Sequence, residues 1–174
     1  MINLDGSTLI GKGGERECYI HPMDESKIIK VEYAHNKAKS NDQNSLDIYY
    51  YQRLNQVEGV FDHIPRMYNR VETNKGSGLV FDSIVDYTGN VSKTFEEFVK
   101  SKQLNTVAEK RCLDELHGYI LKNNIMFYDA VLSNILCQEY AKNQYKLIIV
   151  DGLGGRKIGL KLWLRMNVSY FKKH

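Results

Sequence analysis

The sequence predicts an α+β fold, because its strands come first and its helices follow. In residues 1–82 short apolar runs alternate with turn residues, which is typical of strands. After Asn90 the apolar residues recur every three or four positions, which is typical of helices. The 174 residues suffice for one substantial core or for two small lobes that share a cleft, so a single domain is expected.

Three strands are expected near the amino end. Residues 9–10 and 18–20 flank the glycine-rich turn Gly11-Lys12-Gly13-Gly14, and residues 27–33 form a third strand with Lys30 at its centre. These strands should form an antiparallel meander.

One helix is expected next, over residues 45–54. Leu46, Tyr50 and Leu54 recur every four residues and mark its apolar face, and Asp47 lies beside that face. Extended segments should follow at 64–68, 71–73 and 78–82.

Two helices and a hairpin complete the predicted chain. Thr94-x-x-Glu97 and Thr106-x-x-Glu109 each fit a capping box, and the second helix should end near Asn123-Asn124. Two apolar runs, 135–137 and 147–150, are then expected to pair as a hairpin.

Composition excludes several classes of protein. With 43% hydrophobic and 26% charged residues the chain matches ordinary globular proteins, and a net charge of +3 does not by itself imply a polyanionic partner. The start of the chain has neither a basic head nor a long apolar run, so a cytoplasmic protein is expected. Its three cysteines are widely spaced, which favours reduced thiols over a disulfide or zinc site.

Residues suited to phosphate transfer occur in a definite order. The glycine turn comes first, Lys30 lies in an apolar strand, Asp129 precedes Asn134 by five residues, and Asp151 precedes a glycine. In protein-kinase-like sites a strand lysine neutralises the nucleotide phosphates, a helix carboxylate fixes that lysine and a loop aspartate orients the attacking hydroxyl. An asparagine and a later aspartate hold magnesium.

This order assigns a role to each candidate. The catalytic candidates are Lys30, Asp47 and Asp129, and the magnesium ligands are Asn134 and Asp151. Contacts to ATP are expected from Gly11, Gly13, Gly14, Lys30, Phe81 and Asp82.

Each motif alone has a simpler explanation. The glycines could form a plain hairpin turn, and Lys30 could face solvent from an edge strand. Asp129 could cap a turn while Asn134 bonds the backbone, and Asp151-Gly152 could simply end a strand. The coincidence of all four motifs favours the site.

The chain resembles the YrbL family of PhoP regulatory network proteins, within the protein-kinase-like superfamily. The residues that carry the resemblance are 11–22, 27–33, 50–54, 78–82 and 134–137. It covers nearly the whole chain and implies a minimal two-lobed kinase-like fold. The amino-terminal lobe would span about 1–82, the hinge about 81–90 and a reduced, truncated carboxy-terminal lobe about 91–174.

Several residues depart from the kinase pattern. Asp47 stands where kinases use glutamate, which shortens its reach towards Lys30, and Phe127 replaces a histidine. Val131 replaces the lysine that protein-serine/threonine kinases place two residues after the base, and only 23 residues follow Asp151. We therefore expect the acceptor to be a small molecule or an envelope sugar rather than a protein.

The sequence thus predicts an ATP- and magnesium-dependent phosphotransferase that acts on a hydroxyl. A pseudokinase or regulatory nucleotide-binding module acting through a protein partner is the alternative, favoured by Asp47, Phe127 and Val131. Transfer of AMP instead of phosphate on the same fold stays open.

The carboxy-terminal tail, residues 156–174, contains six Lys and Arg residues and no acidic residue, interleaved with aromatic and aliphatic side chains. A final core helix with a solvated basic face is the first interpretation, and contact with an anionic membrane surface is the second. Nucleic-acid binding is the least supported of the three.

Overall fold

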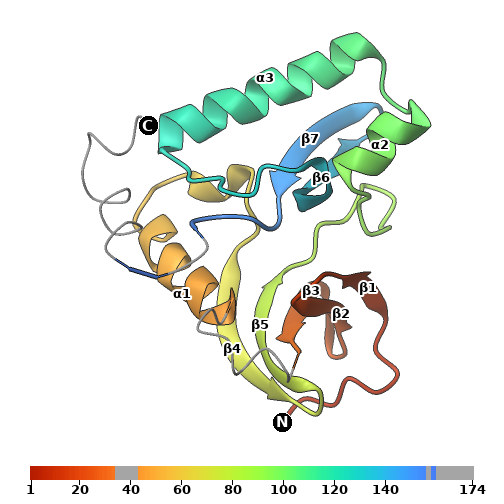
Figure 1. Ribbon diagram of the computed structural model, residues 1–174. Coiled ribbons are helices and arrows are strands. Elements are labelled where there is room, and N and C mark those ends of the chain that lie inside the picture. The colour runs from red at the N-terminus through yellow and green to blue at the C-terminus, as the bar shows by residue number, and fades with distance from the viewer. Residues whose placement is uncertain (34–42, 156–157, 160–174) are drawn as a thin grey trace.

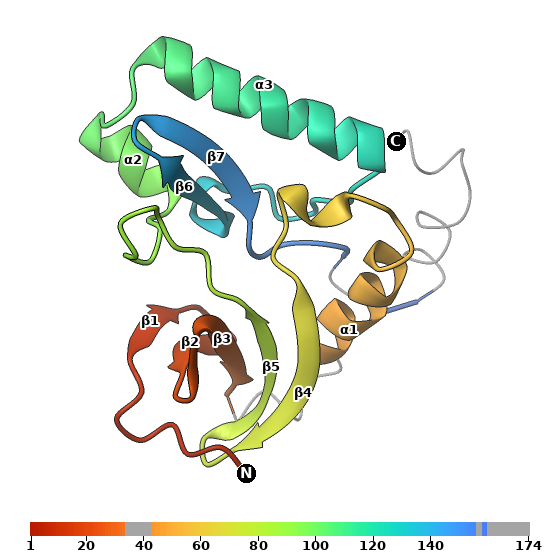
Figure 2. The same ribbon diagram turned by 180° about the vertical axis from the view of Figure 1, so that it is seen from behind.

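The computed structural model describes residues 1–33, 43–155 and 158–159. A five-stranded sheet and one helix form one half, and two helices with a two-stranded hairpin form the other (Figures 1 and 2). The predicted α+β class is confirmed.

All strands of the larger sheet pair antiparallel, in the order β1-β2-β3-β5-β4. The strands are β1 (Leu9–Lys12), β2 (Arg16–His21), β3 (Asp24–Glu32), β4 (Met67–Thr73) and β5 (Gly76–Asp82). The predicted meander is therefore present as β1–β3, whereas the segments expected at 64–68 and 71–73 contribute to the single strand β4. Lys30 lies at the centre of the sheet, opposite Cys18 on β2 and Leu79 on β5.

The remaining elements surround the second half of the fold. They are α1 (Gln43–Leu54), α2 (Phe95–Ser101), α3 (Thr106–Asn123), β6 (Ile135–Ala141) and β7 (Gln144–Ile149), with short 3-10 turns at Val60–Asp62 and Leu132–Asn134. Strands β6 and β7 form the predicted hairpin, and they lie beneath α3 in Figure 1.

The two helix starts differ from each other. Thr94 caps α2 through the predicted box, since its hydroxyl accepts from the Glu97 amide and the Glu97 carboxylate accepts from the Thr94 amide. The second predicted box is wrong, because Asn105 and not Thr106 is the N-cap of α3. The Asn105 side chain accepts from the Ala108 amide, as expected of a residue that is among the strongest caps.

One large apolar cluster joins the two halves. It begins on α1 with Leu46 and Tyr50, passes through Phe81 on β5, and continues to Leu116 on α3 and Leu147 on β7. A smaller cluster covers the other face of the sheet and contains Leu4, Tyr19, Ile29, Val31 and Val80. Because the first cluster is continuous, the two halves fold around a common core.

The loop that follows α1 is bonded to the helical half. The Tyr119 hydroxyl donates to the carbonyl of Val60, and Nδ1 of His63 donates to the carbonyl of Leu147 over 2.7 Å. The Ile149 amide donates to the carbonyl of His63 over 2.8 Å. These three bonds fix the loop after α1 to α3 and β7.

Across the described ranges, no helix combines the length and apolar character needed to cross a bilayer. The predicted basic tail lies outside the described residues, apart from Ile158 and Gly159. The hinge position at 81–90 and the cytoplasmic location stay predictions.

Candidate active site

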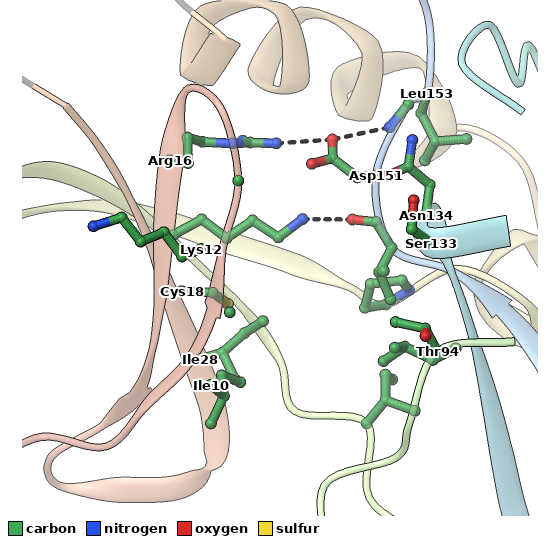
Figure 3. A pocket seen from close by; sticks show the side chains of 18 of the residues that line it. Ile10, Lys12, Arg16, Cys18, Ile28, Thr94, Ser133, Asn134, Asp151 and Leu153 are labelled. Carbon is green, nitrogen blue, oxygen red and sulfur yellow. Dashed lines mark hydrogen bonds and ion pairs between the residues drawn. The ribbon is translucent and has the colours of Figure 1, made fainter. Parts of the chain in front are cut away.

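A cleft of about 880 Å³ lies between the glycine turn on one side and the segments around Asp129 and Asp151 on the other (Figure 3). All of the predicted site residues except Asp47 and Phe81 line it. Segments separated by more than a hundred residues in the sequence thus meet at one place.

Lys30 enters the cleft from the centre of the sheet and is 7% exposed. Its ammonium donates to the backbone carbonyl of Val150 and lies 4.8 Å from the centroid of the Phe81 ring. Phe81, expected to contact ATP, is itself 1% exposed and belongs to the core beneath the lysine. The sequence did not predict that Phe81 faces the core, because residues on both faces of β5 are apolar.

Asp47 is paired differently from the expectation. Its Oδ2 atom accepts from Nη1 of Arg16 over 2.5 Å, whereas Lys30 bonds Val150. Asp47 has a shorter side chain than the glutamate of kinases, and the long Arg16 side chain reaches towards α1 to bond it. Arg16 is a site residue that the sequence analysis did not identify.

Arg16 also reaches Asp151 across the cleft. Its Nη2 atom donates to Oδ1 of Asp151 over 2.9 Å, and the Arg16 side chain is only 6% exposed (Figure 3). Burial lowers the pKa of Arg16, but the carboxylates of Asp47 and Asp151 outweigh this effect and raise that pKa above its ordinary value. The guanidinium therefore stays charged between two carboxylates.

Asp151 lies in a strongly positive environment. Burial raises its pKa, but the charges of Lys30 and Arg16 and the hydrogen bond from the Gly152 amide lower the pKa to about 2. Asp151 is consequently an anion at neutral pH, as a metal ligand must be.

Asp129 and Asn134 are held together on the opposite segment. The Asn134 amide nitrogen donates to the carbonyl of Asp129 over 2.9 Å and to its Oδ2 atom over 3.2 Å. The amides of Tyr128 and Asp129 both donate to the carbonyl of Gly152, over 2.9 and 3.1 Å. The loop that carries Asp129 therefore lies directly against the segment that carries Asp151.

Gly152 is required at this contact for two reasons. Its φ of +78° is in the left-handed region, and a Cβ atom there would lie 2.7 Å from the carbonyl oxygen of Asp129. The same Cβ would lie 3.0 Å from the Asn134 side-chain nitrogen. Any larger residue would push Asp129 and Asn134 away from their positions.

Asp82 lines the cleft, but its carboxylate is already bonded. It accepts from Nζ of Lys27 and from the hydroxyl of Tyr68, each over 2.7 Å, and from the Arg66 amide over 2.9 Å. Its side chain therefore braces the end of β5 against β3 and β4.

Part of the cleft lining is apolar. Ile10, Cys18, Ile28 and Leu136 form this part, and the first three are seen together on one wall in Figure 3. Arg16 and Cys18 are two residues apart on β2, so their side chains lie on the same face of the strand and both line the cleft. This alternation could have identified Arg16 from the sequence.

The donor set suits a hard cation held by few protein ligands. Within residues 1–33, 43–155 and 158–159, no group of three or more His, Cys, Asp or Glu side chains is arranged to hold a metal ion. Asn134 uses its side-chain nitrogen on Asp129, which leaves its oxygen available, and Asp151 is ionised. An amide oxygen and a carboxylate fit magnesium, which keeps several positions for water and phosphate.

The chain resembles proteins of one family over its whole length. The family model for PhoP regulatory network protein YrbL matches residues 2–174. Proteins described as "Uncharacterized protein YrbL" from Escherichia coli (strain K12) and Shigella flexneri are each 31% identical over 156 residues, or 88% of this chain and 74% of the relative.

The fold resembles a solved kinase-like structure. The structure described as "PpkA-294 apo form" superimposes with a TM-score of 0.58 at 18% identity, covering 83% of this chain and 56% of that one. This chain thus spans little more than half the length of that protein. The predicted kinase-like fold is confirmed at the level of the fold alone.

Proposed function

The chain belongs to the YrbL family of PhoP regulatory network proteins, and from the geometry of its cleft we propose that it is an ATP- and magnesium-dependent phosphotransferase acting on a hydroxyl. One observation carries the proposal. Lys30, Asp129, Asn134 and Asp151, which the sequence separates by up to 121 positions, line a single cleft together with the glycine turn.

The cleft can accept a nucleotide in one orientation. Its apolar wall, formed by Ile10, Cys18 and Ile28, suits a planar base, which would gain by leaving water. The glycine turn lines the same cleft and would lie along the phosphates. Gly11, Gly13 and Gly14 all lack a left-handed φ, so the turn geometry does not require glycine. Their missing side chains instead let phosphate approach the backbone closely.

Lys30 would contact those phosphates. Its buried ammonium bonds a neutral carbonyl, that of Val150, and a buried charge is stabilised further by an anionic partner. Asn134 and Asp151 would hold magnesium on the same side. When bound, magnesium neutralises charge on the bridging phosphate oxygens and keeps the transferred group aligned.

Asp129 would orient the acceptor. It is exposed at the mouth of the cleft, and Asn134 fixes its Oδ2 atom. In the proposed step the acceptor oxygen forms a bond to the terminal phosphorus while the bond to the bridging oxygen of ADP breaks. The hydroxyl proton passes to the Asp129 carboxylate. Val131, two residues further on, supplies no charge for a protein acceptor, so a small molecule or envelope sugar is favoured.

Turnover of ATP to ADP with magnesium tests the proposal, with water as the acceptor until the natural one is known. Asp129→Asn and Asp151→Asn should each lower the rate at least about a hundredfold, because each removes charge from the reacting groups. Asp114→Asn is the matched control, since that carboxylate is 65% exposed on α3 and pairs with Lys110. Turnover that survives both cleft substitutions would rule out the mechanism, and mass spectrometry of the product distinguishes phosphate from AMP transfer.

A regulatory nucleotide-binding module is the second candidate. It is favoured by the bonding of Asp47 and Asp151 to Arg16, which leaves Lys30 without the helix carboxylate that kinases use. A thermal-shift titration separates the two, because a ligand at a hundred times its Kd adds about 2.7 kcal/mol to stability. Stabilisation by ATP that depends on magnesium supports the phosphotransferase, and stabilisation by ATP that does not depend on magnesium supports the regulatory module; no stabilisation supports a scaffold that binds no nucleotide and acts through a protein partner.

A further inference from the structure

The position of Arg16 bears on how the proposed site takes up its metal, so the inference below rests on the proposed function. Arg16 is the first residue of β2 and lies two residues after Gly14, the last residue of the glycine turn. Its side chain reaches Asp151 on the far wall of the cleft (Figure 3). It also bonds Asp47 on α1. One charged group therefore joins the sheet, the helix and the metal-ligand candidate.

The Oδ1 atom of Asp151 has no room for a metal while Arg16 is in place. It accepts two hydrogen bonds of 2.9 Å, one from Nη2 of Arg16 and one from the Gly152 amide. A metal ligand must direct a lone pair at the cation, and those of Oδ1 already point at donors. The positive guanidinium also repels a second cation at so short a distance.

Of the two ion pairs that Arg16 forms, the one with Asp151 should break more readily. The other terminal nitrogen of Arg16 bonds Asp47 over 2.5 Å, a pair in which both side chains are less than a tenth exposed. The bond to Asp151 involves a carboxylate that is 42% exposed and is correspondingly weaker. A guanidinium can keep one partner and turn its remaining donors to an arriving phosphate, for which its geometry is suited.

We infer that Arg16 competes with magnesium for Asp151, so that the free protein binds the metal only weakly and magnesium enters together with nucleotide. The phosphates supply the anionic partner that draws Arg16 from Asp151. The device makes metal binding conditional on nucleotide binding at the same site. Arg16 is a positioning residue in this scheme, because it acts through Asp151.

Binding of Mn²⁺ without nucleotide tests the inference, since Mn²⁺ shares the oxygen ligands of Mg²⁺ and its free form is measured by electron paramagnetic resonance. Arg16→Gln leaves Asp47 buried without its cation, so the informative protein is Arg16→Gln with Asp47→Asn, in which two neutral amides can bond each other. Asp47→Asn alone is its reference, because it has the same change at residue 47 and retains Arg16. Two further variants are controls. Arg16→Lys keeps the positive charge at residue 16, and Lys12→Gln removes a cation on the glycine turn whose side chain is 66% exposed.

The double variant should bind Mn²⁺ about ten- to a hundredfold more tightly than Asp47→Asn, which is the effect of losing one competing charge-assisted hydrogen bond. Arg16→Lys and Lys12→Gln should bind Mn²⁺ as weakly as the wild-type protein. Equal affinity of the double variant and Asp47→Asn would overturn the inference, as would tight Mn²⁺ binding by the wild-type protein. Titration of the same proteins with ATP and magnesium is read separately. If ATP fails to bind any of them, the proposed function fails, while the Mn²⁺ comparison still decides the role of Arg16.

Discussion

Replacing Gly152 with alanine tests the contact that holds the two catalytic segments together. The new Cβ would meet the carbonyl oxygen of Asp129 at 2.7 Å and the Asn134 side-chain nitrogen at 3.0 Å, so the backbone has to shift. Gly89 is a matched control because its φ of +85° is similar, while a Cβ added there would have open space for 4 Å around it. Both substitutions place alanine in the left-handed region, and only Gly152→Ala adds a collision.

The expected losses of stability follow from these two contributions. Left-handed backbone at a residue with a side chain costs about 1–2 kcal/mol, which both variants share. The collision at Gly152 should cost about 1–3 kcal/mol more, the range seen when atoms are forced into packed sites. Changes in the entropy of the unfolded chain are the same for the two glycines and cancel in the comparison.

Equilibrium unfolding in urea measures the difference. With a slope of about 2 kcal/mol per molar urea, the midpoint of Gly152→Ala should lie about 0.5–1.5 M below that of Gly89→Ala. Gly152→Ala should also lose the stabilisation by ATP and magnesium, because Asp129 and Asn134 are displaced. Equal midpoints for the two variants would refute the close packing of Gly152 against the Asp129 segment.

Three other predictions concern caps, ionisation and the joint between the two halves. Asn105→Ala should lower the free energy of unfolding by about 1 kcal/mol through loss of the α3 cap, and Thr106→Ala by less than about 0.5 kcal/mol, as measured by urea unfolding; the reverse order would restore Thr106 as the cap. The folded-state pKa of Asp151 is lowered to about 2 from 3.8, so its contribution is complete above pH 3.8 and is lost as the pH falls through about 2. Because 42% of its side chain is exposed, acid should destabilise the wild-type protein by only about 1 kcal/mol more than Asp151→Asn, and an equal loss in the two would contradict the shift. Tyr119→Phe should cost about 1–3 kcal/mol in urea unfolding, because the buried carbonyl of Val60 loses its donor, and an unchanged midpoint would show that water replaces the hydroxyl.

Local patterns predicted most of the elements. The glycine turn between β1 and β2, the apolar spacing of α1 and the Thr94 box of α2 are all determined by neighbouring residues, and each was found in place. The start of α3 was misplaced by one residue. Two adjacent residues could both act as caps there, and the side chain of Asn105 bonds more effectively than that of Thr106.

Long-range pairing was only partly predictable. The glycine turn, Lys30, Asp129 and Asp151 could be placed in one cleft because their order matches a known kind of site. The pairing of Asp47 with Arg16 could not, since it depends on which of two cations, Arg16 or Lys30, reaches α1 across a fold that the sequence does not show. Phe81 was assigned to the ligand for a similar reason: a strand that is apolar throughout gives no sign of which side chains face the core.

The bonds that join Val60 and His63 to α3 and β7 have a mechanical consequence. They tie the loop after α1 to the helical half, so that opening and closing of the cleft should proceed as a rotation of the sheet about that loop rather than as separation of two independent bodies. Asp47 on α1 and Arg16 on β2 would move with the sheet in such a rotation. Occupancy of the cleft should therefore slow amide hydrogen exchange in residues 55–63, although those residues do not line the cleft.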